Sequence, residues 1–199
     1  ILSSGPLTYA AEGMIRAHQA GCGAVVTKTI RHEAAINPVH HIGKINSDSL
    51  INCEKWADSP AEVWFEREIP MAKKAGCVVI ASVGHTYPEA HDLVKPAEEA
   101  GADMIELVSY TEDTILPMLE TTLKQVKIPV LCKLSGNWPD PVSTAKKCLE
   151  MGAAGITAID SIGPTLKIDI KNARPEMMGP GGTGWLSGGA IRPIALRIN

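Results

Sequence analysis

Two lysines that end apolar stretches are the residues best placed to do chemistry. Lys28 follows the run at residues 24–27, and Lys133 lies within the run at residues 129–134. An ammonium group that is withdrawn from water needs a partner, so two lysines in one pocket favour an anion or an electron-rich oxygen as the ligand. Small polar residues follow the other apolar runs. This pattern predicts a polar pocket for an anionic cofactor or substrate.

A repeated helix–glycine–strand pattern must position these lysines. Four times, a helical stretch ends at a small residue and a glycine, and an apolar run follows within a few residues. A glycine after a helix adopts the left-handed conformation that ends it, and a continuous Val/Ile run is typical of a strand buried on both faces. The predicted strands that start at Val78, Met104, Val130 and Ile156 lie 26 residues apart. This period indicates parallel βα repeats.

The repeat favours one architecture. Six strands are predicted, at residues 1–4, 24–29, 78–83, 104–109, 130–135 and 156–160. A doubly wound sheet could hold six strands, but no Gly-x-Gly-x-x-Gly follows the first one, which favours the α/β class with a (β/α)₈ TIM barrel. About six of its eight strands are then present. We expect a single domain, residues 1–199, that is truncated at both ends and has open sheet edges.

Helix boundaries give further predictions. Ser59 and Asp140 each precede a proline and are expected to cap helices. Pro96 lies inside the helical pattern of residues 92–100, which is expected to be kinked or short. Residues 190–199 are expected to be helical.

Composition excludes several functional classes. Nineteen Lys and Arg residues against 22 Asp and Glu residues give a net charge of −3, and no basic run is present. Nucleic-acid binding is therefore disfavoured. No apolar run reaches the roughly 20 residues that span a bilayer, so no membrane association is expected. Five scattered cysteines without a C-x-x-C spacing suggest neither disulfides nor a metal site, and they favour the reducing cytoplasm.

The remaining histidines and cysteines receive structural interpretations. His32, His40, His41 and His85 are too scattered for a metal set, so we expect surface or loop roles and no bound metal. Cys132 precedes Lys133 by one residue and is expected to face the helices, because side chains alternate along a strand.

Six blocks of the sequence resemble, in order and spacing, the FMN-binding barrel of dihydroorotate and dihydropyrimidine dehydrogenases. The last block ends in Ser-Gly-x-Ala-Ile-Arg-Pro-x-Ala-Leu and is the most specific. The blocks are residues 3–5, 26–29, 46–52, 132–135, 160–163 and 182–196. The resemblance implies FMN in the barrel mouth, with hydride transfer between the flavin N5 and a ring C–C bond of a small, cyclic, pyrimidine-like substrate.

The resemblance also implies roles for single residues. Lys133 matches the lysine beside the flavin N1 and O2, where a cation stabilises the reduced ring. Ser109 and Lys133 are the predicted catalytic residues. The predicted cofactor-binding residues are Ser4, Gly5, Lys28, Thr29, Lys133, Ser187 and Gly188. The predicted substrate-binding residues are Lys28, Asn46, Leu50, Asn52, Asp160 and Ser161. For Asn46 and Asn52, ordinary loop chemistry is the alternative.

The sequence departs from the family pattern at two strand ends. Where the family has Asn-Leu-Ser-Cys-Pro-Asn, residues 107–112 read Leu-Val-Ser-Tyr-Thr-Glu, so the asparagines that read a pyrimidine are absent. Ser109 or Tyr110 could donate the proton, and an inward-packing serine is the alternative. Where the family has Asn-Ser, this chain has Asp160-Ser161. Asp160 could instead pair with Lys133 or Lys28.

Three functional hypotheses stay open at this point. The first is a flavin-dependent dehydrogenase with a non-standard substrate, and the second is a catalytically silent barrel that serves as a binding or scaffold subunit. The third is a different (β/α)₈ enzyme that uses its lysines on a phosphate or a carbonyl group. The resemblance leaves two partners open as well, an iron–sulfur or flavin protein that transfers electrons and a second copy of the chain.

Overall fold

A curved parallel sheet forms the centre of the protein. The computed structural model describes residues 1–199. The sheet has the order β1-β4-β5-β6-β7, and an isolated parallel bridge joins Leu2 to Val25 at the outer edge of β1. The strands are β1 (Val25–Val26), β4 (Val79–Gly84), β5 (Met104–Val108), β6 (Val130–Leu134) and β7 (Gly155–Ala158). Each lies within the limits predicted from the sequence or one residue outside them, and the first predicted strand is reduced to the bridge at Leu2.

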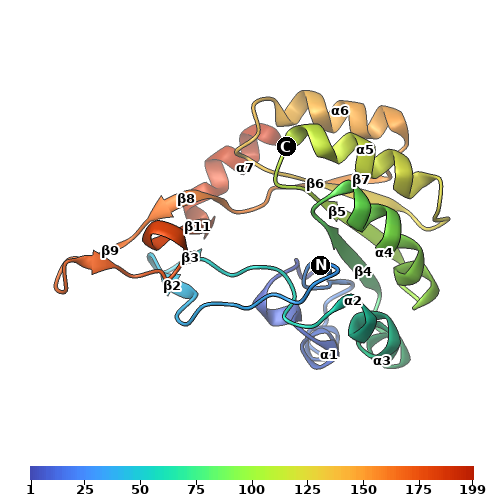
Figure 1. The fold of residues 1–199 in the computed structure, drawn as a ribbon, viewed down its shortest axis with the longest axis horizontal. Coiled ribbons are helices and arrows are strands. Elements are labelled where there is room, and N and C mark those ends of the chain that lie inside the picture. Colours follow the sequence, from blue (N-terminus) through green and yellow to red (C-terminus); the bar gives the residue numbers. More distant parts are fainter.

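Helices follow the strands and cover the outer face of the curve (Figure 1). They are α1 (Ala11–Gln19), α2 (Ala61–Val63), the π-helical turn η2 (Trp64–Glu68), α3 (Ile69–Lys74), α4 (Tyr87–Glu99), α5 (Glu112–Leu123), α6 (Pro141–Met151) and α7 (Arg192–Ile198). Short 3₁₀ turns occupy η1 (Pro6–Thr8), η3 (Pro180–Gly182) and η4 (Gly189–Ile191). The protein is therefore an α/β fold with a parallel half-barrel sheet. No helix is long and apolar enough to cross a membrane.

Alternation along the strands separates two apolar layers. Val25, Val79 and Ile105 belong to the main core of 31 buried residues, which fills the space between sheet and helices. Val26 and Ile80, each one residue further along, belong to a separate small cluster. Successive side chains of a strand point to opposite faces, so this small cluster lies on the concave face. It forms the floor beneath the polar residues at the strand ends.

The predicted helix boundaries are confirmed in part. Gly21, Gly76, Gly101 and Gly152 all have φ between 90° and 109°, the left-handed conformation that ends a helix. Asp140 caps α6, because its side chain accepts a hydrogen bond from the backbone N–H of Ser143 at 3.1 Å.

One helix prediction is wrong, and the second, a kinked or short helix around Pro96, is wrong as to length. Ser59 is not a cap, since α2 begins after Pro60 and has no side-chain cap. The helix around Pro96 is not shortened. It begins at Tyr87, where Thr86 and Glu89 form a capping box, and it continues through Pro96 to Glu99. Pro96 removes one backbone donor, but the surrounding turns hold the helix together.

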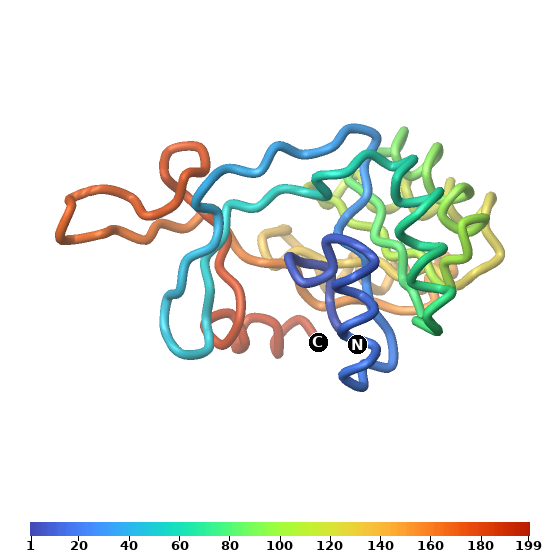
Figure 2. Tube along the Cα trace, turned by 90° about the horizontal axis from the view of Figure 1, so that it is seen from below, coloured from blue at the N-terminus to red at the C-terminus, as the bar shows by residue number.

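A second, antiparallel sheet was not predicted and lies across the concave side of the half-barrel (Figures 1 and 2). Its order is β2-β3-β11-β8. The strands are β2 (Ile42–Lys44), β3 (Ser49–Asn52), β8 (Ile162–Leu166) and β11 (Thr183–Gly188). A two-stranded ribbon of β9 (Ile168–Asp169) and β10 (Arg174–Pro175) projects beyond it. This sheet joins the segment after β1 to the segment after β7, and it faces the carboxyl ends of the parallel strands.

Candidate active site at the mouth of the half-barrel

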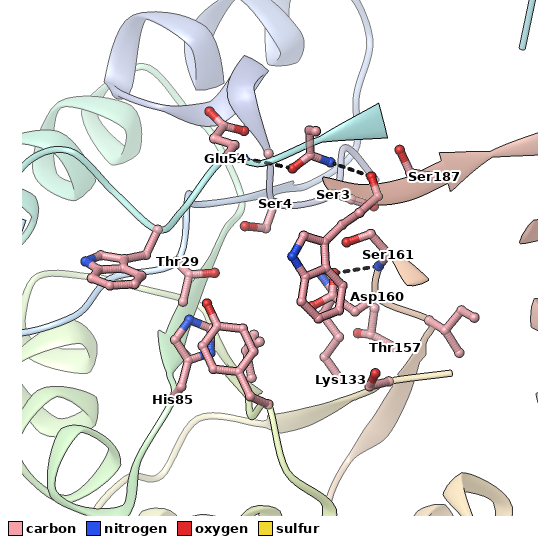
Figure 3. Close-up of a pocket in the computed structure, with 18 of the residues that line it drawn as sticks. Ser3, Ser4, Thr29, Glu54, His85, Lys133, Thr157, Asp160, Ser161 and Ser187 are labelled. Carbon is pink, nitrogen blue, oxygen red and sulfur yellow. Dashed lines mark hydrogen bonds and ion pairs between the residues drawn. The ribbon is translucent and has the colours of Figure 1, made fainter. Parts of the chain in front are cut away.

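A cavity of about 420 Å³ lies between the carboxyl ends of the parallel strands and the antiparallel sheet (Figure 3). Parallel strands present their loops at this end, which is where barrel enzymes place their sites. Most of the residues predicted from the sequence line this cavity. They are Ser4, Gly5, Lys28, Thr29, Asn52, Ser109, Lys133, Asp160, Ser161, Ser187 and Gly188. Segments far apart in the chain therefore converge at one place, while the roles of these residues stay predictions.

Lys133 stands at the centre of the cavity floor. Its neighbours in the sheet register are Val108 on β5 and Thr157 on β7. The ammonium nitrogen lies 3.5 Å from Oδ1 of Asp160, which resolves the open pairing of this carboxylate in favour of Lys133. Burial alone would lower the pKa of Lys133, but the negative charges of Asp160 and Glu106 outweigh it and raise that pKa. Lys133 is a buried cation whose ion pair is long, so its donors are available to a ligand.

Glu106 lies beneath Lys133 on β5 and is 2% exposed. Its Oε2 accepts a hydrogen bond of 2.8 Å from the hydroxyl of Thr157, while its Oε1 has no hydrogen-bond partner. Burial raises the pKa of Glu106 because the charged form is poorly solvated. The sequence offers one signal for this residue, a single charge inside an apolar strand, and Glu106 is not among the predicted site residues.

Lys28 forms a tighter ion pair. Its ammonium nitrogen lies 2.9 Å from Oε2 of Glu54, and both side chains are 10% exposed. Glu54 follows β3, so the pair links the half-barrel to the antiparallel sheet. Nothing in the sequence marked Glu54, because the strand that positions it was not predicted.

The three residues predicted on the substrate loop lie in different surroundings. Asn52 lines the cavity, with its side-chain nitrogen donating to the carbonyl of Trp185 at 3.3 Å and its Oδ1 accepting from the backbone N–H of Glu54 at 3.2 Å. Asn46 is exposed, and its Oδ1 accepts a hydrogen bond from the backbone of Asp48, which is ordinary turn chemistry. Leu50 is 46% exposed and does not line the cavity.

Ser109 lies on the cavity wall, but its hydroxyl is already engaged. It is 4% exposed and donates to the carbonyl oxygen of Thr111 at 2.9 Å. It also contacts the hydroxyl of Thr114, and its oxygen accepts from the backbone N–H of Thr111. Both interpretations of Ser109 therefore keep support, because the serine packs inward and also reaches the cavity.

His85 lies in a loop, as expected, but not at the surface. It directly follows the last residue of β4, is only 8% exposed and lines the cavity. Its ring stacks on Tyr110 with centroids 3.9 Å apart, and Trp56 meets it edge-on at 6.3 Å. The backbone N–H of His85 donates to Oε2 of Glu89 at 2.5 Å, which fixes the residue at the start of α4. A lone histidine in a sequence gives no signal of this burial.

The cysteines behave as expected. Cys132 is fully buried in the core between sheet and helices, where its thiol lies against the thiol of Cys148 on α6. All five cysteines are free thiols.

The arrangement suits a flat, polar ring. Two ammonium groups and several hydroxyls provide charge and hydrogen bonds, while Ile159 and Trp185 provide apolar surface. A largely preformed cavity of this size that combines apolar walls with a few convergent polar groups is typical of a cofactor or small-molecule site.

Comparisons with known proteins find similar subunits of dihydroorotate and dihydropyrimidine dehydrogenases. The catalytic subunit of dihydroorotate dehydrogenase B (NAD⁺) from Methanothermobacter thermautotrophicus is 30% identical over 99% of this chain and 68% of its own length. The corresponding subunit from Methanocella arvoryzae is 32% identical over the same shares. The dihydropyrimidine dehydrogenase subunit PreA of Escherichia coli is 28% identical over 99% of this chain, which spans 54% of that relative.

Two further comparisons give no information on function. No family model matches the chain. Among solved structures, a dihydrodipicolinate synthase from Oceanobacillus iheyensis covers 50% of each chain at 12% identity, with a TM-score of 0.36.

Proposed function

We propose, because the chain belongs to the family of dihydroorotate and dihydropyrimidine dehydrogenases, that it is an FMN-dependent oxidoreductase acting on a small, cyclic, pyrimidine-like substrate. The single observation that carries the proposal is Lys133, a buried cation at the mouth of the half-barrel that keeps donors free for a ligand. A cation at this place favours a ring that gains negative charge on reduction.

The cavity residues fit the ring system of a flavin. The donor set combines the ammonium groups of Lys28 and Lys133 with the hydroxyls of Ser4, Thr29 and Ser187, and these suit the carbonyl oxygens and ring nitrogens of an isoalloxazine. Gly5 also lines the cavity, and a side chain there would meet open space, so a ring can approach its backbone. Gly188 lines the cavity as well, and its missing side chain lets it pack against the backbone of Asp48. When bound, FMN would supply hydride exchange with a ring carbon of the substrate.

The remaining lining residues are proposed to hold the substrate. Asn52 lines the cavity from β3 of the antiparallel sheet, and Asp160 and Ser161 line it from the segment after β7; Asp160 and Ser161 lie close together in Figure 3. Asp160 can accept hydrogen bonds but, when ionised, cannot donate them. A substrate that presents N–H groups toward Asp160 is therefore favoured over one that presents a carbonyl there.

Proton transfer is proposed for Ser109. Its hydroxyl donates its proton to the Thr111 carbonyl oxygen and also contacts the hydroxyl of Thr114. Rotation of the hydroxyl would release this proton toward the cavity. Its burial keeps bulk water away from the atom.

Partner proteins are part of the proposal. Two relatives are named as a catalytic subunit and one as a subunit of a dehydrogenase, and this chain spans 54% to 68% of their lengths. We expect an iron–sulfur or flavin protein as the electron-transfer partner, and a homodimer of the chain itself. The flavin is the group that such a partner would reduce or oxidise.

A binding experiment tests the proposal. FMN is titrated into the purified protein while the quenching of flavin fluorescence and the shift of the visible band are followed. Saturable binding that weakens about tenfold or more in Lys133→Met supports it. Lys124→Met, which removes an exposed lysine of the α5 end with a 69% exposed side chain, is the matched control and should bind as the unaltered protein does. Absence of saturable binding would contradict the proposal.

A further inference from the structure

His85 is a buried polar side chain that the proposed chemistry does not yet use. It lines the cavity from the end of β4, on the opposite side from Lys133 and Asp160 (Figure 3). Both ring nitrogens are buried, and neither has a hydrogen-bond partner. Leaving such groups unpaired costs free energy, which a ligand that pairs with them would recover. A ligand that forms hydrogen bonds with the His85 nitrogens would therefore gain affinity.

The surroundings of His85 keep the imidazole in its neutral form. Burial, with help from the positive charge of Arg31, lowers the pKa of His85 to about 4. Lys133 acts in the same direction, while Glu89 and Asp160 oppose it. A neutral imidazole has one N–H donor and one bare acceptor nitrogen. It can therefore donate to a carbonyl oxygen or accept from a ring N–H.

Tyr110 is the group that covers the imidazole. It stacks on His85 at 3.9 Å between centroids with an interplanar angle of 15°, and it is itself 54% exposed in the loop between β5 and α5. A stacked pair of this kind is held weakly compared with the cost of two unpaired buried nitrogens. Tyr110 covers only the face of the ring, whereas the N–H and the bare nitrogen of the imidazole point outward in its plane. If Tyr110 moves aside, a flat ligand can reach the edge of His85 and gain a hydrogen bond that the tyrosine ring does not supply.

We propose that His85 is a substrate-contacting residue that recognises the amide group of a planar heterocycle, and that Tyr110 is the movable cover over it. The inference rests on the proposed function and names the residue that reads the substrate. It also accounts for the altered segment at residues 107–112: the amide chemistry that asparagine side chains would offer there comes from the neighbouring strand end, and Tyr110 stands in the altered segment itself.

The ligand pair that tests this proposal is uracil and its doubly N-methylated derivative. Both are flat, neutral rings with carbonyl groups, but only uracil has N–H groups. His85→Phe keeps a flat ring against Tyr110 and removes both nitrogens, while His85→Asn restores a donor and an acceptor. His91→Phe, on the exposed face of α4 with a 57% exposed side chain, is the matched control.

The expected result is a difference between the two ligands. Uracil should bind His85→Phe about 10- to 100-fold more weakly than the unaltered protein, with partial recovery in His85→Asn and no change in His91→Phe. The methylated ring should lose less affinity, because it has no N–H for the bare nitrogen of His85 to accept and can pair only through a carbonyl oxygen. Equal affinities of unaltered protein and His85→Phe for uracil would overturn the inference.

A spectroscopic measurement decides the inference without flavin and without a variant that must fold. The unaltered protein is prepared with isotope-labelled histidine, and the imidazole nitrogen signals are followed by NMR during a uracil titration. A saturable shift of the His85 nitrogens supports the proposal, and their invariance at saturating uracil overturns it. Failure of the proposed function would appear separately, as an absence of FMN binding.

Discussion

Lys28 and Glu54 form an ion pair of 2.9 Å across the cavity mouth, and each side chain is 10% exposed. Lys28 follows β1 of the half-barrel, and Glu54 follows β3 of the antiparallel sheet. The pair therefore links the antiparallel sheet, which was not predicted, to the parallel sheet, which was. It also neutralises one of the two lysines, which leaves Lys133 with the longer and weaker ion pair.

Glu54→Gln should leave Lys28 without its counter-charge. We expect the free energy of unfolding to fall by about 1 to 3 kcal/mol, because a poorly hydrated cation loses its partner. Urea denaturation measures the change. The control is Glu120→Gln, which breaks an exposed ion pair with Lys124 and should change stability by less than about 0.5 kcal/mol. Equal effects of the two substitutions would show that the Lys28 pair contributes no more than a surface pair.

The two proposed helix caps should respond differently to alanine. Asp140→Ala removes the hydrogen bond to the backbone of Ser143 and should cost about 1 kcal/mol of unfolding free energy. Ser59→Ala removes no cap hydrogen bond and should cost only a few tenths of that. Thermal unfolding of the two variants side by side checks the prediction, and a larger loss for Ser59→Ala would contradict the helix boundary.

His85 should make the stability of the protein fall in acid. Its folded-state pKa of about 4 lies below the ordinary value of 6.5, so the unfolded chain binds the proton more readily. The stabilising contribution is complete above pH 6.5 and is lost as the pH falls toward 4. Lowering the pH from 7.5 to 5 should cost about 2 kcal/mol relative to His85→Phe. Urea denaturation of both proteins at the two pH values measures this difference, and parallel pH profiles would contradict it.

Glu106 should make the stability of the protein fall as the pH rises. Burial raises its folded-state pKa above the unfolded value, so the native protein holds the proton more readily. Its contribution is complete below the unfolded pKa and is lost as the pH rises through the folded one. The stability of the unaltered protein should therefore fall relative to Glu106→Gln as the pH is raised from about 4.5. A gap between the two proteins that does not change with pH would show that folding does not raise the pKa of Glu106.

The half-barrel could be predicted because local signals mark it. Each apolar run forms a strand that neighbours bury on both faces, and each preceding glycine has the backbone freedom that ends a helix. Gly76 and Gly101 mark the starts of β4 and β5 to within a few residues. The sequence pattern predicts these helix ends and strands correctly because both are formed by residues that are neighbours in the chain.

The antiparallel sheet could not be predicted because its pairings are distant. Ser187 on β11 lies opposite Leu50 on β3, 137 residues away in the sequence. Its strands are short and partly exposed, and they do not alternate clearly between apolar and polar residues. No local pattern predicts such a pairing.

The site predictions share this limit. Residues at the ends of parallel strands, such as Lys133, lie where the repeat places them. Asn52 and Leu50 lie on the same face of β3, but only Asn52 lines the cavity. The sequence does not reveal the strand pairing that separates the two. Glu54 and His85 were missed because their burial depends on the second sheet and on aromatic neighbours from other loops.

The most direct test of the central claim is an anaerobic titration of the FMN-loaded protein with dihydrouracil and with dihydroorotate, followed by the visible flavin absorption. The proposed oxidoreductase predicts that one of these rings bleaches the flavin band in proportion to the amount added, and that Lys133→Met slows the bleaching by about tenfold or more. A flavin band that both rings leave unchanged, in protein that has bound FMN, would contradict the proposed activity and favour a barrel that only binds.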